Sequence, residues 1–374
     1  MLNLLIKFGL IWSGTNGNDH FAGTAGRDKA WGGFGHDHLW MGGGDDLAYG
    51  GGGNDAIQGG DGDDEIWGES GDDILHGDAG NDTVNGGSGE DFLVAGDGDD
   101  TAYGGHQDDT IFGGEGDDLI SGGHDDDKLY GGGGNDRILG GNGNDEIWGG
   151  AGFDSISAGD GADVIHGGEG QDDIDGGAGW DVLDFSDADS QIRVHLDLGR
   201  GFWGDSQGDT YANIEEVIGS DHNDYLKGDD AANVLRGGDG RDVLKGEGGI
   251  DHIHAGTNDP NLGWGDMLFG GAEMDFFYFR QGDSGAGGPK DIIMDFAQGE
   301  DMIAIDGAAN TDFLGFGHAF SGNQGAEVYF NHVYDQHYGW VTEVHQRDDM
   351  GASSDLDIQL LGIHQLTEAD FFIY

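Results

Sequence analysis

Apolar side chains recur at every ninth residue through the first half of the chain, from Phe21 to Leu183. An aspartate lies two residues before each of them. Glycine in turn precedes seventeen of these nineteen aspartates by two positions, with Gln107 and Asp125 as the exceptions. Three residues centred on an apolar position are too short for an isolated strand, but they suffice for one rung of a stacked sheet. The pattern therefore predicts a solenoid built from nine-residue units.

The aspartates define position six of the unit, and the apolar residues define position eight. Glycine is frequent at positions one, two and four, where it allows positive φ and lets neighbouring turns approach closely. This pattern, G-G-x-G-x-D-x-U-x, is typical of a parallel β-roll that binds Ca²⁺. The position-six aspartates of the first array are Asp19, Asp28, Asp37, Asp46, Asp55, Asp64, Asp73, Asp82, Asp91, Asp100, Asp109, Asp118, Asp127, Asp136, Asp145, Asp154, Asp163, Asp172 and Asp181, and a later array adds Asp224, Asp242, Asp251, Asp266 and Asp275.

Position eight is expected to point inward, with successive repeats on opposite sides of the roll. Two repeats then close one coil of eighteen residues, so that Asp55 lies above Asp73. Like charges about 4.8 Å apart repel strongly unless a cation lies between them. Ca²⁺ binds six to eight hard oxygens, and stacked turns supply both carboxylates and backbone carbonyls. We therefore predict about 17 Ca²⁺ sites between coils of the first array and roughly 20 in the whole chain.

The composition agrees with a metal-bound roll. The chain has 75 acidic and 14 basic residues, a formal charge of −61, and 82 glycines, a balance that predicts disorder for an ordinary domain. Roughly 20 ions would cancel about 40 charges and leave the surface acidic. We therefore expect neither nucleic acid nor an anionic membrane as a partner. The absence of cysteine excludes disulfides and thiolate catalysis, and no apolar stretch is long enough for membrane insertion.

The start of the chain is apolar, and residues 1–13 are predicted to form a strand that caps the first rung, because a roll otherwise exposes an unpaired edge. The alternative is a signal peptide. Against it, the only cation, Lys7, lies inside the apolar stretch, and no small-x-small cleavage site precedes Gly14. Residues 14–184 form the first predicted roll, with nineteen repeats.

The periodicity breaks after this array. Residues 185–218 are predicted to form a β insertion, in which Gln191–Leu198 alternates as a strand with one apolar face. A second roll is predicted at 219–284, interrupted by six extra residues within 255–263. Asn233 occupies a position-six place there, and its neutral oxygen predicts a weaker or empty site. Residues 285–374 are predicted to be a C-terminal domain that caps the second roll.

From Phe276 onward the glycine density falls and alternating apolar segments predict strands. One helical turn is expected at Leu366–Ala369. The predicted fold class is all-β, with a parallel β-roll, that is, a calcium-binding solenoid, followed by a C-terminal β-sandwich-like domain. The predicted strands are Phe276–Phe279, Ile292–Phe296, Met302–Ile305, Val328–Tyr334, Trp340–His345 and Ile358–Ile363.

The repeats resemble those of the RTX (repeats-in-toxin, haemolysin-type) proteins that Gram-negative bacteria export. The segment FFYFRQGDSGAGGPKDIIMDFAQGEDMIAID (276–306) is similar to the domain that follows the roll in serralysin-type metalloproteases. The ending IQLLGIHQLTEADFFIY (358–374) is also similar, with Glu368 and Asp370 before four aromatic or aliphatic residues. The resemblance implies an uncleaved C-terminal signal for the type I secretion apparatus and an extracellular location. The protease domain of that family precedes the array, where this sequence has only 13 residues.

Possible catalytic motifs are few, and we predict no catalytic residue. The sequence has no HExxH, so a zinc protease has no site. Gly204–Gly208 matches G-x-S-x-G around Ser206, but a nucleophile elbow needs a strand before it and a helix after it. Gly282–Gly285 is similar to a trypsin-like serine segment around Ser284, although no such fold fits this chain.

Two histidines suggest a second kind of metal site. His252 and His254 alternate on one face of a predicted strand, where they could share a transition metal. The alternative is that both are solvated outward side chains, since they flank the inward residue Ile253.

Aromatic residues at position nine form two predicted rows on opposite outer faces. Flat aromatic rows beside Ca²⁺ sites can stack on sugar rings, and the R-modules of alginate epimerases, which are built from a similar repeat, bind polysaccharide. The alternative is that aromatic residues cover the sheet or pack on a neighbouring segment. The rows are Trp31, Tyr49 and Trp67, and Phe112, Tyr130 and Trp148.

The sequence thus predicts a secreted calcium-binding repeat protein, not an enzyme, that folds on binding Ca²⁺ after type I export. The runner-up is a Ca²⁺-dependent module that binds extracellular carbohydrate or mediates adhesion. An enzyme remains a third possibility only if 185–218 or 285–374 contains an unfamiliar site.

Overall fold

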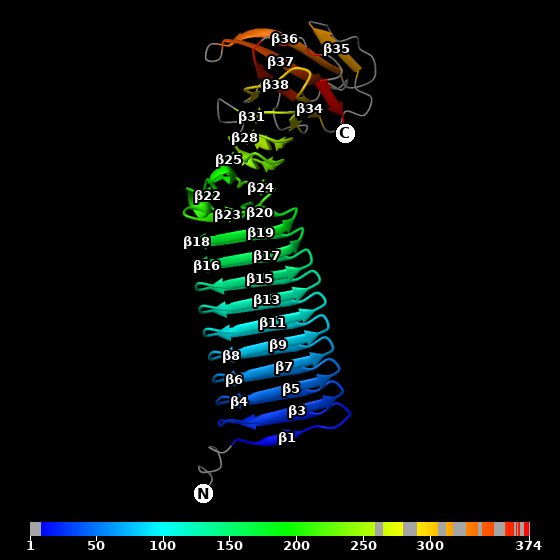
Figure 1. Ribbon diagram of the computed structural model, residues 1–374, viewed down its shortest axis with the longest axis vertical. Coiled ribbons are helices and arrows are strands. Elements are labelled where there is room, and N and C mark those ends of the chain that lie inside the picture. Colours follow the sequence, from blue (N-terminus) through cyan, green and yellow to red (C-terminus); the bar gives the residue numbers. More distant parts are fainter. Residues whose placement is uncertain are drawn as a thin grey trace. The chain divides into compact units, whose positions relative to one another are not determined.

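The computed structural model describes residues 9–258, 265–279, 290–305, 312–316, 327–335, 339–347, 356–362, 364, 366 and 370–373. They divide into two compact units (Figure 1). The first comprises the chain up to Val182 together with Gly208–Ile214, and the second comprises Leu183–Gln207 together with the chain from Glu215 onward. The described residues form β-strands and two short 3-10 turns, without an α-helix. No helix in this part of the chain could therefore cross a membrane.

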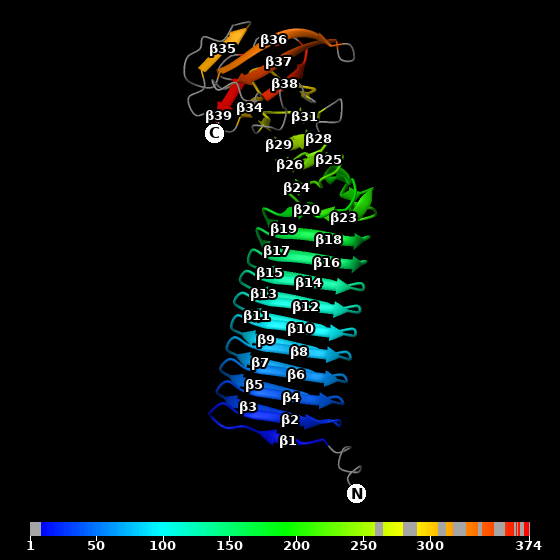
Figure 2. The same ribbon diagram turned by 180° about the vertical axis from the view of Figure 1, so that it is seen from behind.

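The first unit consists of two stacks of short parallel strands, which Figures 1 and 2 show from opposite sides. Neighbouring strands of a stack pair residues eighteen apart, for example Thr101 with Leu119, which confirms the predicted coil of two repeats. One stack is β1 (Ile11–Ser13), β3 (Lys29–Phe34), β5 (Leu47–Gly52), β7 (Glu65–Ser70), β9 (Thr83–Ser88), β11 (Thr101–His106), β13 (Leu119–His124), β15 (Arg137–Asn142), β17 (Ser155–Gly161), β19 (Asp173–Gly179) and β23 (Thr210–Ala212). The other is β2 (His20–Thr24), β4 (His38–Gly43), β6 (Ala56–Asp61), β8 (Ile74–Ala79), β10 (Phe92–Asp97), β12 (Thr110–Glu115), β14 (Lys128–Gly133), β16 (Glu146–Gly152) and β18 (Val164–Gly170); β20 (Val182–Asp184) lies at the boundary of the units.

The core of this unit is thin. Position-eight side chains from Ala30 to Leu183 are 0–2% exposed and face one another from the two stacks. Position one also points inward, and where it is not glycine it holds the fully buried Met41, Ala95 or Ala158. The prediction that position eight forms two inward ladders is therefore confirmed.

The glycines differ in their roles. Most of those at positions two and four have positive φ, such as Gly42 (φ 107°) and Gly44 (φ 99°), as predicted. Position-one glycines do not, so the prediction of positive φ was wrong there. A Cβ on Gly68 would lie 2.2 Å from Oδ2 of Asp73, so position one is small because the carboxylate needs the space. Gln107 and Asp125 keep the left-handed conformation of position four, each with φ 74°.

Two adjacent glycines should respond oppositely to alanine. In Gly42→Ala the new Cβ would lie 2.2 Å from the carbonyl oxygen of Thr24 at positive φ, whereas at Gly43 the nearest atom is 3.5 Å away. We expect Gly42→Ala to lower the free energy of unfolding by about 2 kcal/mol or more. Gly43→Ala should be neutral or stabilise by about 0.5 kcal/mol. Denaturant unfolding in Ca²⁺ measures both, and equal losses would contradict the assigned turn geometry.

The N-terminal strand is a rung of the same stack. β1 pairs in parallel with β3 at an interval of eighteen residues, with Trp12 opposite Ala30. Leu10 takes the place of a position-six residue, since its N–H donates to Oδ1 of Asp28. The remainder of the predicted cap, residues 1–8, lies outside the described residues.

The second unit also contains two parallel stacks. One is β21 (Arg193–His195), β25 (Tyr225–Lys227), β28 (Val243–Glu247), β31 (Met267–Gly271), β33 (Asp291–Ile293) and β38 (Leu356–Leu361). The other is β24 (Glu216–Ile218), β26 (Val234–Arg236), β29 (His252–His254), β32 (Phe276–Phe279), β34 (Met302–Ile305) and β39 (Phe371–Ile373). The remaining elements are β22 (Arg200–Gly201), β27 (Asp239–Gly240), β30 (Thr257–Asn258), β35 (Asp312–Phe316), β36 (Glu327–Asp335), β37 (Gly339–Arg347) and the 3-10 turns η2 (Leu196–Leu198) and η3 (Gly204–Ser206).

The last strands extend one stack with an antiparallel addition. β37 pairs antiparallel with β38, and β36 pairs antiparallel with β37. The six predicted C-terminal strands correspond to β32, β33, β34, β36, β37 and β38, with small shifts at their ends. A separate β-sandwich is not confirmed and stays a prediction. The predicted helical turn falls mostly on residues outside the described ones.

The predicted strand Gln191–Leu198 is shorter than its alternation suggested. Only Arg193–His195 is extended, and η2 follows directly. Ile192 and Val194 are buried as expected, but Leu198 is 59% exposed. Gly199, at φ 58°, ends the turn and lets the chain reverse into β22.

Candidate metal sites

The position-six aspartates form two continuous ladders inside the first unit, one for each alternate set of repeats. From Asp28 to Asp181 they are at most 4% exposed. The backbone N–H of each aspartate donates to Oδ1 of the aspartate eighteen residues later, at 2.6–3.0 Å. Seventeen such bonds run from Asp19 to Asp181. The structure therefore places the carboxylates one above another, as the spacing predicted.

The second oxygen of these carboxylates differs from the first. From Asp37 to Asp172 each Oδ2 is buried without a hydrogen-bond partner among the described residues. Asp242, Asp251 and Asp275 of the second unit share this feature. A buried charged oxygen without a partner costs free energy of about 1–3 kcal/mol or more. The repetition of this arrangement at successive coils fits the donor set of a cation site.

A backbone oxygen lies close to several of these carboxylates. A Cβ built on Gly68 would be 2.2 Å from Oδ2 of Asp73 and 2.7 Å from the carbonyl oxygen of Gly86, one coil further on. Both oxygens therefore face the same point. No three histidine, aspartate or glutamate side chains of the described residues converge on a common site. A cation there would need backbone carbonyls besides carboxylates, which is the mixed oxygen set that Ca²⁺ accepts.

Burial changes the acidity of the ladders. Removal from water, followed by repulsion from neighbouring carboxylates, raises the pKa of Asp73 and Asp109 to about 8, although backbone N–H donors oppose the rise. The same causes raise the pKa of Asp46 to about 7, and burial raises the pKa of Asp55 to about 6. Without a cation these carboxyl groups therefore bind protons at a higher pH than an ordinary aspartate does.

This shift predicts how the metal-free protein responds to pH. Carboxyl groups whose pKa is higher in the folded state than the ordinary 3.8 bind more protons when folded. Their contribution to stability is complete below the ordinary pKa and is lost as pH rises through about 6 to 8. In EGTA we expect β structure at pH 5 that disappears by pH 8, as followed by circular dichroism. An unchanged spectrum, or a gain of structure with rising pH, would contradict the prediction.

At the start of each array the Oδ2 atoms of the aspartates accept hydrogen bonds from protein groups. The Thr24 backbone N–H donates to Oδ2 of Asp28 at 2.6 Å, and its hydroxyl lies 3.1 Å from the same oxygen. Ser220 contacts Asp224 in the same way, and Thr15 contacts Asp19. Asp19, Asp28 and Asp224 thus have less capacity for a cation than the other predicted ligands.

Asn233 occupies its predicted place in a ladder of the second unit. It is buried, and its N–H donates to Oδ1 of Asp251 at 2.9 Å. Its own Oδ1 already accepts the N–H of Asp229 at 2.8 Å. The neutral amide is therefore satisfied internally, which supports the prediction of a weaker or empty site.

Three aspartates that the nine-residue count missed continue the ladders. The N–H groups of Asp172, Asp266 and Asp275 donate to Oδ1 of Asp209, Asp291 and Asp301, at 2.9, 2.9 and 3.1 Å. Their separations are 37, 25 and 26 residues instead of eighteen, so a fixed period could not find them. The detectable signal is a buried apolar residue two places later, as in Asp301 and Ile303.

Ser206 has a structural role in the insertion. It is fully buried in η3, and its hydroxyl donates to the carbonyl oxygen of Trp203 at 2.7 Å. The N–H of Arg193 donates to the same hydroxyl at 3.3 Å. These bonds fasten η3 to β21, and the strand–turn–helix context of a nucleophile elbow is not present. Ser284 lies outside the described residues.

The two candidate histidine ligands are engaged by aromatic residues. Nδ1 of His252 lies 2.7 Å from the Tyr278 hydroxyl. His254 stacks on the Tyr278 ring at 4.3 Å, with the ring planes 7° apart. Burial lowers the pKa of His252 below its ordinary value, and the Arg236 charge adds to this. Both side chains point outward from the strand and are half-buried, and both contact Tyr278.

The aromatic rows form as predicted on opposite stacks. Phe112, Tyr130 and Trp148 stack at 4.5 and 4.3 Å with nearly parallel planes, so their faces cover one another. Trp31, Tyr49 and Trp67 are also parallel, but their centroids are 6.1 and 6.3 Å apart. This wider offset leaves more of each ring face uncovered.

Comparison with solved structures finds similarity at low sequence identity to parts of two extracellular or epimerase proteins. The AlgE6R2 subunit of the mannuronan C5-epimerase from Azotobacter vinelandii is 24% identical, with a TM-score of 0.31, over 42% of this chain and 92% of its own. The extracellular lipase LipA from Serratia marcescens is 16% identical, with a TM-score of 0.22, over 71% of this chain and 39% of its own. No curated protein sequence matches the chain.

The family comparison identifies the repeats. The RTX calcium-binding nonapeptide repeat (4 copies) matches at residues 13–48, 49–84, 85–120, 112–147, 121–156, 139–174, 148–183, 157–191 and 218–253. Together these segments cover more than half of the chain, and they contain most of the buried aspartate ladders. The chain therefore belongs to the RTX calcium-binding nonapeptide repeat family, whose many repeats bind many calcium ions.

Proposed function

We propose that Ca²⁺ binding drives the folding of this protein, and that the position-six aspartates from Asp37 to Asp172 are the primary ligands in the first unit. The observation that supports this most strongly is the pair of ladders of buried Oδ2 atoms without a hydrogen-bond partner among the described residues. Carbonyl oxygens of position one in the next coil, such as that of Gly86, complete the oxygen set. A Ca²⁺ titration followed by circular dichroism tests the proposal.

The geometry links each site to its neighbours. The carboxylate of Asp127 accepts a bond from Asp109, and its own N–H donates to Asp145. An ion that fixes one coil therefore orders half of the next site. A ligand that binds only the folded state shifts the folding equilibrium by mass action, and many linked sites steepen this response.

In this proposal the protein is exported unfolded and folds outside the cell. Low cytosolic Ca²⁺ leaves the buried carboxylates unneutralised, whereas higher extracellular Ca²⁺ fills the sites. We assign no catalytic role to the chain, since the hydroxyl of Ser206 is used in backbone hydrogen bonds.

Export through a type I apparatus would require the C-terminal residues that resemble a secretion signal. We expect a variant that lacks residues 365–374 to remain inside a host cell carrying a type I exporter, because the acidic and aromatic ending is the proposed signal. Immunoblots of medium and cells measure this. Removal of residues 2–8 is the matched control and should leave export unchanged. Normal secretion of the C-terminally shortened chain would refute the proposal.

A second candidate function is carbohydrate binding by the row Trp31, Tyr49 and Trp67. The wide ring offsets and the 36% exposure of Trp31 favour this row over the closely stacked Phe112 row. Each ring would contribute about 1 kcal/mol if it stacks as other aromatic contacts do. Replacement of all three residues by serine would remove glycan retention if the row is the contact, and unchanged retention would make it structural.

A further inference from the structure

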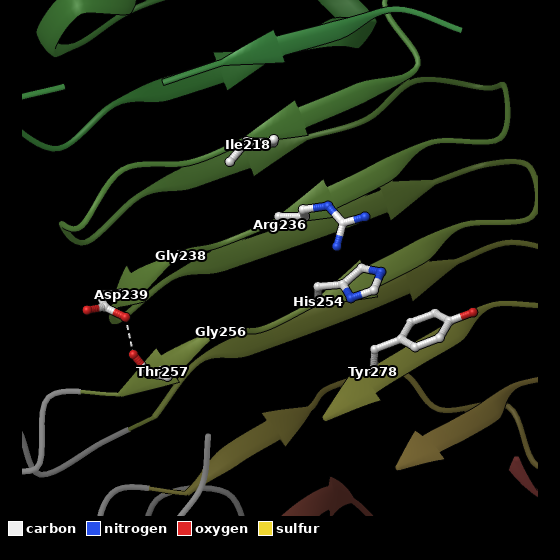
Figure 3. A pocket seen from close by; sticks show the side chains of 8 residues that line it. All are labelled: Ile218, Arg236, Gly238, Asp239, His254, Gly256, Thr257 and Tyr278. Carbon is white, nitrogen blue, oxygen red and sulfur yellow. Dashed lines mark hydrogen bonds between the residues drawn. The ribbon is translucent and has the colours of Figure 1, made fainter. Parts of the chain in front are cut away.

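A hollow of about 280 Å³ lies on the outer face of one stack of the second unit. One wall consists of outward residues of four paired strands, Ile218, Arg236, His254 and Tyr278, which are opposite one another in register. Figure 3 shows these side chains in a column, with Asp239 and Thr257 on the other side.

The floor of the hollow is backbone. Gly238 and Gly256 lie between the two walls and have φ of 94° and 96°. A Cβ on Gly256 would lie 1.9 Å from the carbonyl oxygen of Gly238. A side chain at Gly256 would clash with the backbone of the neighbouring rung, so the two glycines leave the floor of the hollow as bare backbone.

Donors and acceptors stand on different walls. Nε of Arg236 donates to Oε1 of Glu216, which orients the guanidinium and leaves its two Nη groups as further donors. His254 lies flat on Tyr278, so both rings are fixed in orientation. On the opposite wall the Thr257 hydroxyl donates to Oδ1 of Asp239. A ligand here meets a planar donor on one side and a carboxylate on the other.

Charge limits the class of ligand. The single Arg236 cation is already paired with Glu216, and Asp239 adds a second negative charge at the hollow. The whole chain carries a formal charge of −61. An anion would be repelled from this surface, and a cation would meet Arg236. A neutral molecule with several hydroxyl groups suits both walls, because each hydroxyl donates and accepts hydrogen bonds.

We propose that this hollow binds one neutral sugar ring, with Arg236 and Asp239 contacting its hydroxyl groups. The volume of about 280 Å³ is large enough for one pyranose ring. The site does not depend on the aromatic row at Trp31, which belongs to the first unit.

The test uses the full chain saturated with Ca²⁺. The probes are the methyl α-pyranosides of D-glucose, D-galactose and D-mannose, with D-glucuronate as the charged comparison, measured by saturation-transfer NMR and titration calorimetry. We expect saturable binding of at least one neutral sugar, with a dissociation constant of about millimolar. Arg236→Gln and Thr257→Val should each weaken it about tenfold, as expected for loss of a hydrogen bond in the site.

Controls separate this site from the rest of the protein. Arg241→Gln removes another cation of the same unit outside the hollow and should leave binding unchanged. Circular dichroism and the Ca²⁺ midpoint show whether each variant is folded, and Thr257→Val, which keeps the side-chain shape, replaces Arg236→Gln if that variant fails to fold. The proposal is overturned if none of the three neutral sugars binds the folded protein. Tighter binding of D-glucuronate, or equal binding by the site variants, would also overturn it.

Discussion

In excess EGTA at neutral pH the protein is expected to give the circular dichroism spectrum of an unfolded chain, and added Ca²⁺ should convert it to a β spectrum with a Hill slope above one. One buried aliphatic side chain per nine residues contributes only about 1.5–3 kcal/mol, whereas ordering costs about 1–2 kcal/mol per backbone residue. The buried carboxylates oppose folding further, since burial raises the pKa of groups such as Asp109 to about 8. When Ca²⁺ is bound, the same carboxylates favour folding, because their charge is neutralised by the ion.

Mg²⁺ at the same ionic strength is the control for this titration. It demands near-ideal octahedral geometry and retains its water, so mixed carboxylate and carbonyl sites should select against it. A complete β spectrum in EGTA at neutral pH would show that folding does not need the ion. Full folding by Mg²⁺ alone would show that charge screening, not coordination, drives the transition.

Asp136→Asn combined with Asp154→Asn is expected to stabilise the metal-free fold and to weaken folding by Ca²⁺. Both carboxyl groups are buried with raised pKa values of about 6, and Asp136 donates its N–H to Asp154 at 2.8 Å. A rise from 3.8 to about 6 corresponds to a penalty on the order of 3 kcal/mol on each charged group. Asparagine removes this penalty, so the metal-free fold should persist to higher pH. It also removes ligand charge, so the Ca²⁺ midpoint at neutral pH should rise.

Glu146→Gln is the matched control. Glu146 lies at position seven, points outward and pairs with Lys128 at 2.7 Å on a partly exposed surface. Such pairs contribute about 0–1 kcal/mol. Both the pH at which the metal-free fold is lost and the Ca²⁺ midpoint of folding should therefore change little. If the position-six and position-seven variants behave alike, the role assigned to position six is wrong. If the double variant loses stability in EGTA as well, its carboxylates are not the source of the metal-free instability.

Much of the first unit could be predicted from the sequence because its information is local. The inward direction of Ile138 and the position of Asp55 one coil before Asp73 follow from a period that never varies. The positive φ of Gly42 follows from residue chemistry at one position of the turn. A one-residue error would have moved every apolar side chain to the outer face, so the pattern permits a single register.

Other features of the candidate sites could not be predicted, because they depend on contacts between coils that the nine-residue spacing does not encode. Asp209, Asp291 and Asp301 join the ladders through pairing across loops of different lengths, and such loops change the sequence interval without changing the rung geometry. The sequence alone also treated Asp28 and Asp73 as equivalent. Only the structure distinguishes them, because Thr24 satisfies the first carboxylate, whereas no described residue bonds Oδ2 of the second.

The sequence by itself thus determined the roll, its eighteen-residue coil and the residues that face its interior, because a strict repeat of glycine, aspartate and an aliphatic residue specifies each turn locally. The tertiary structure decided which carboxylate oxygens lack a protein partner, which aromatic faces remain open and where the outer surface is hollow. These features arise between coils, where backbone carbonyls, hydroxyl groups and ring planes from separate rungs meet. Their relative positions follow from the stacked backbone, and no residue pattern along the chain specifies them.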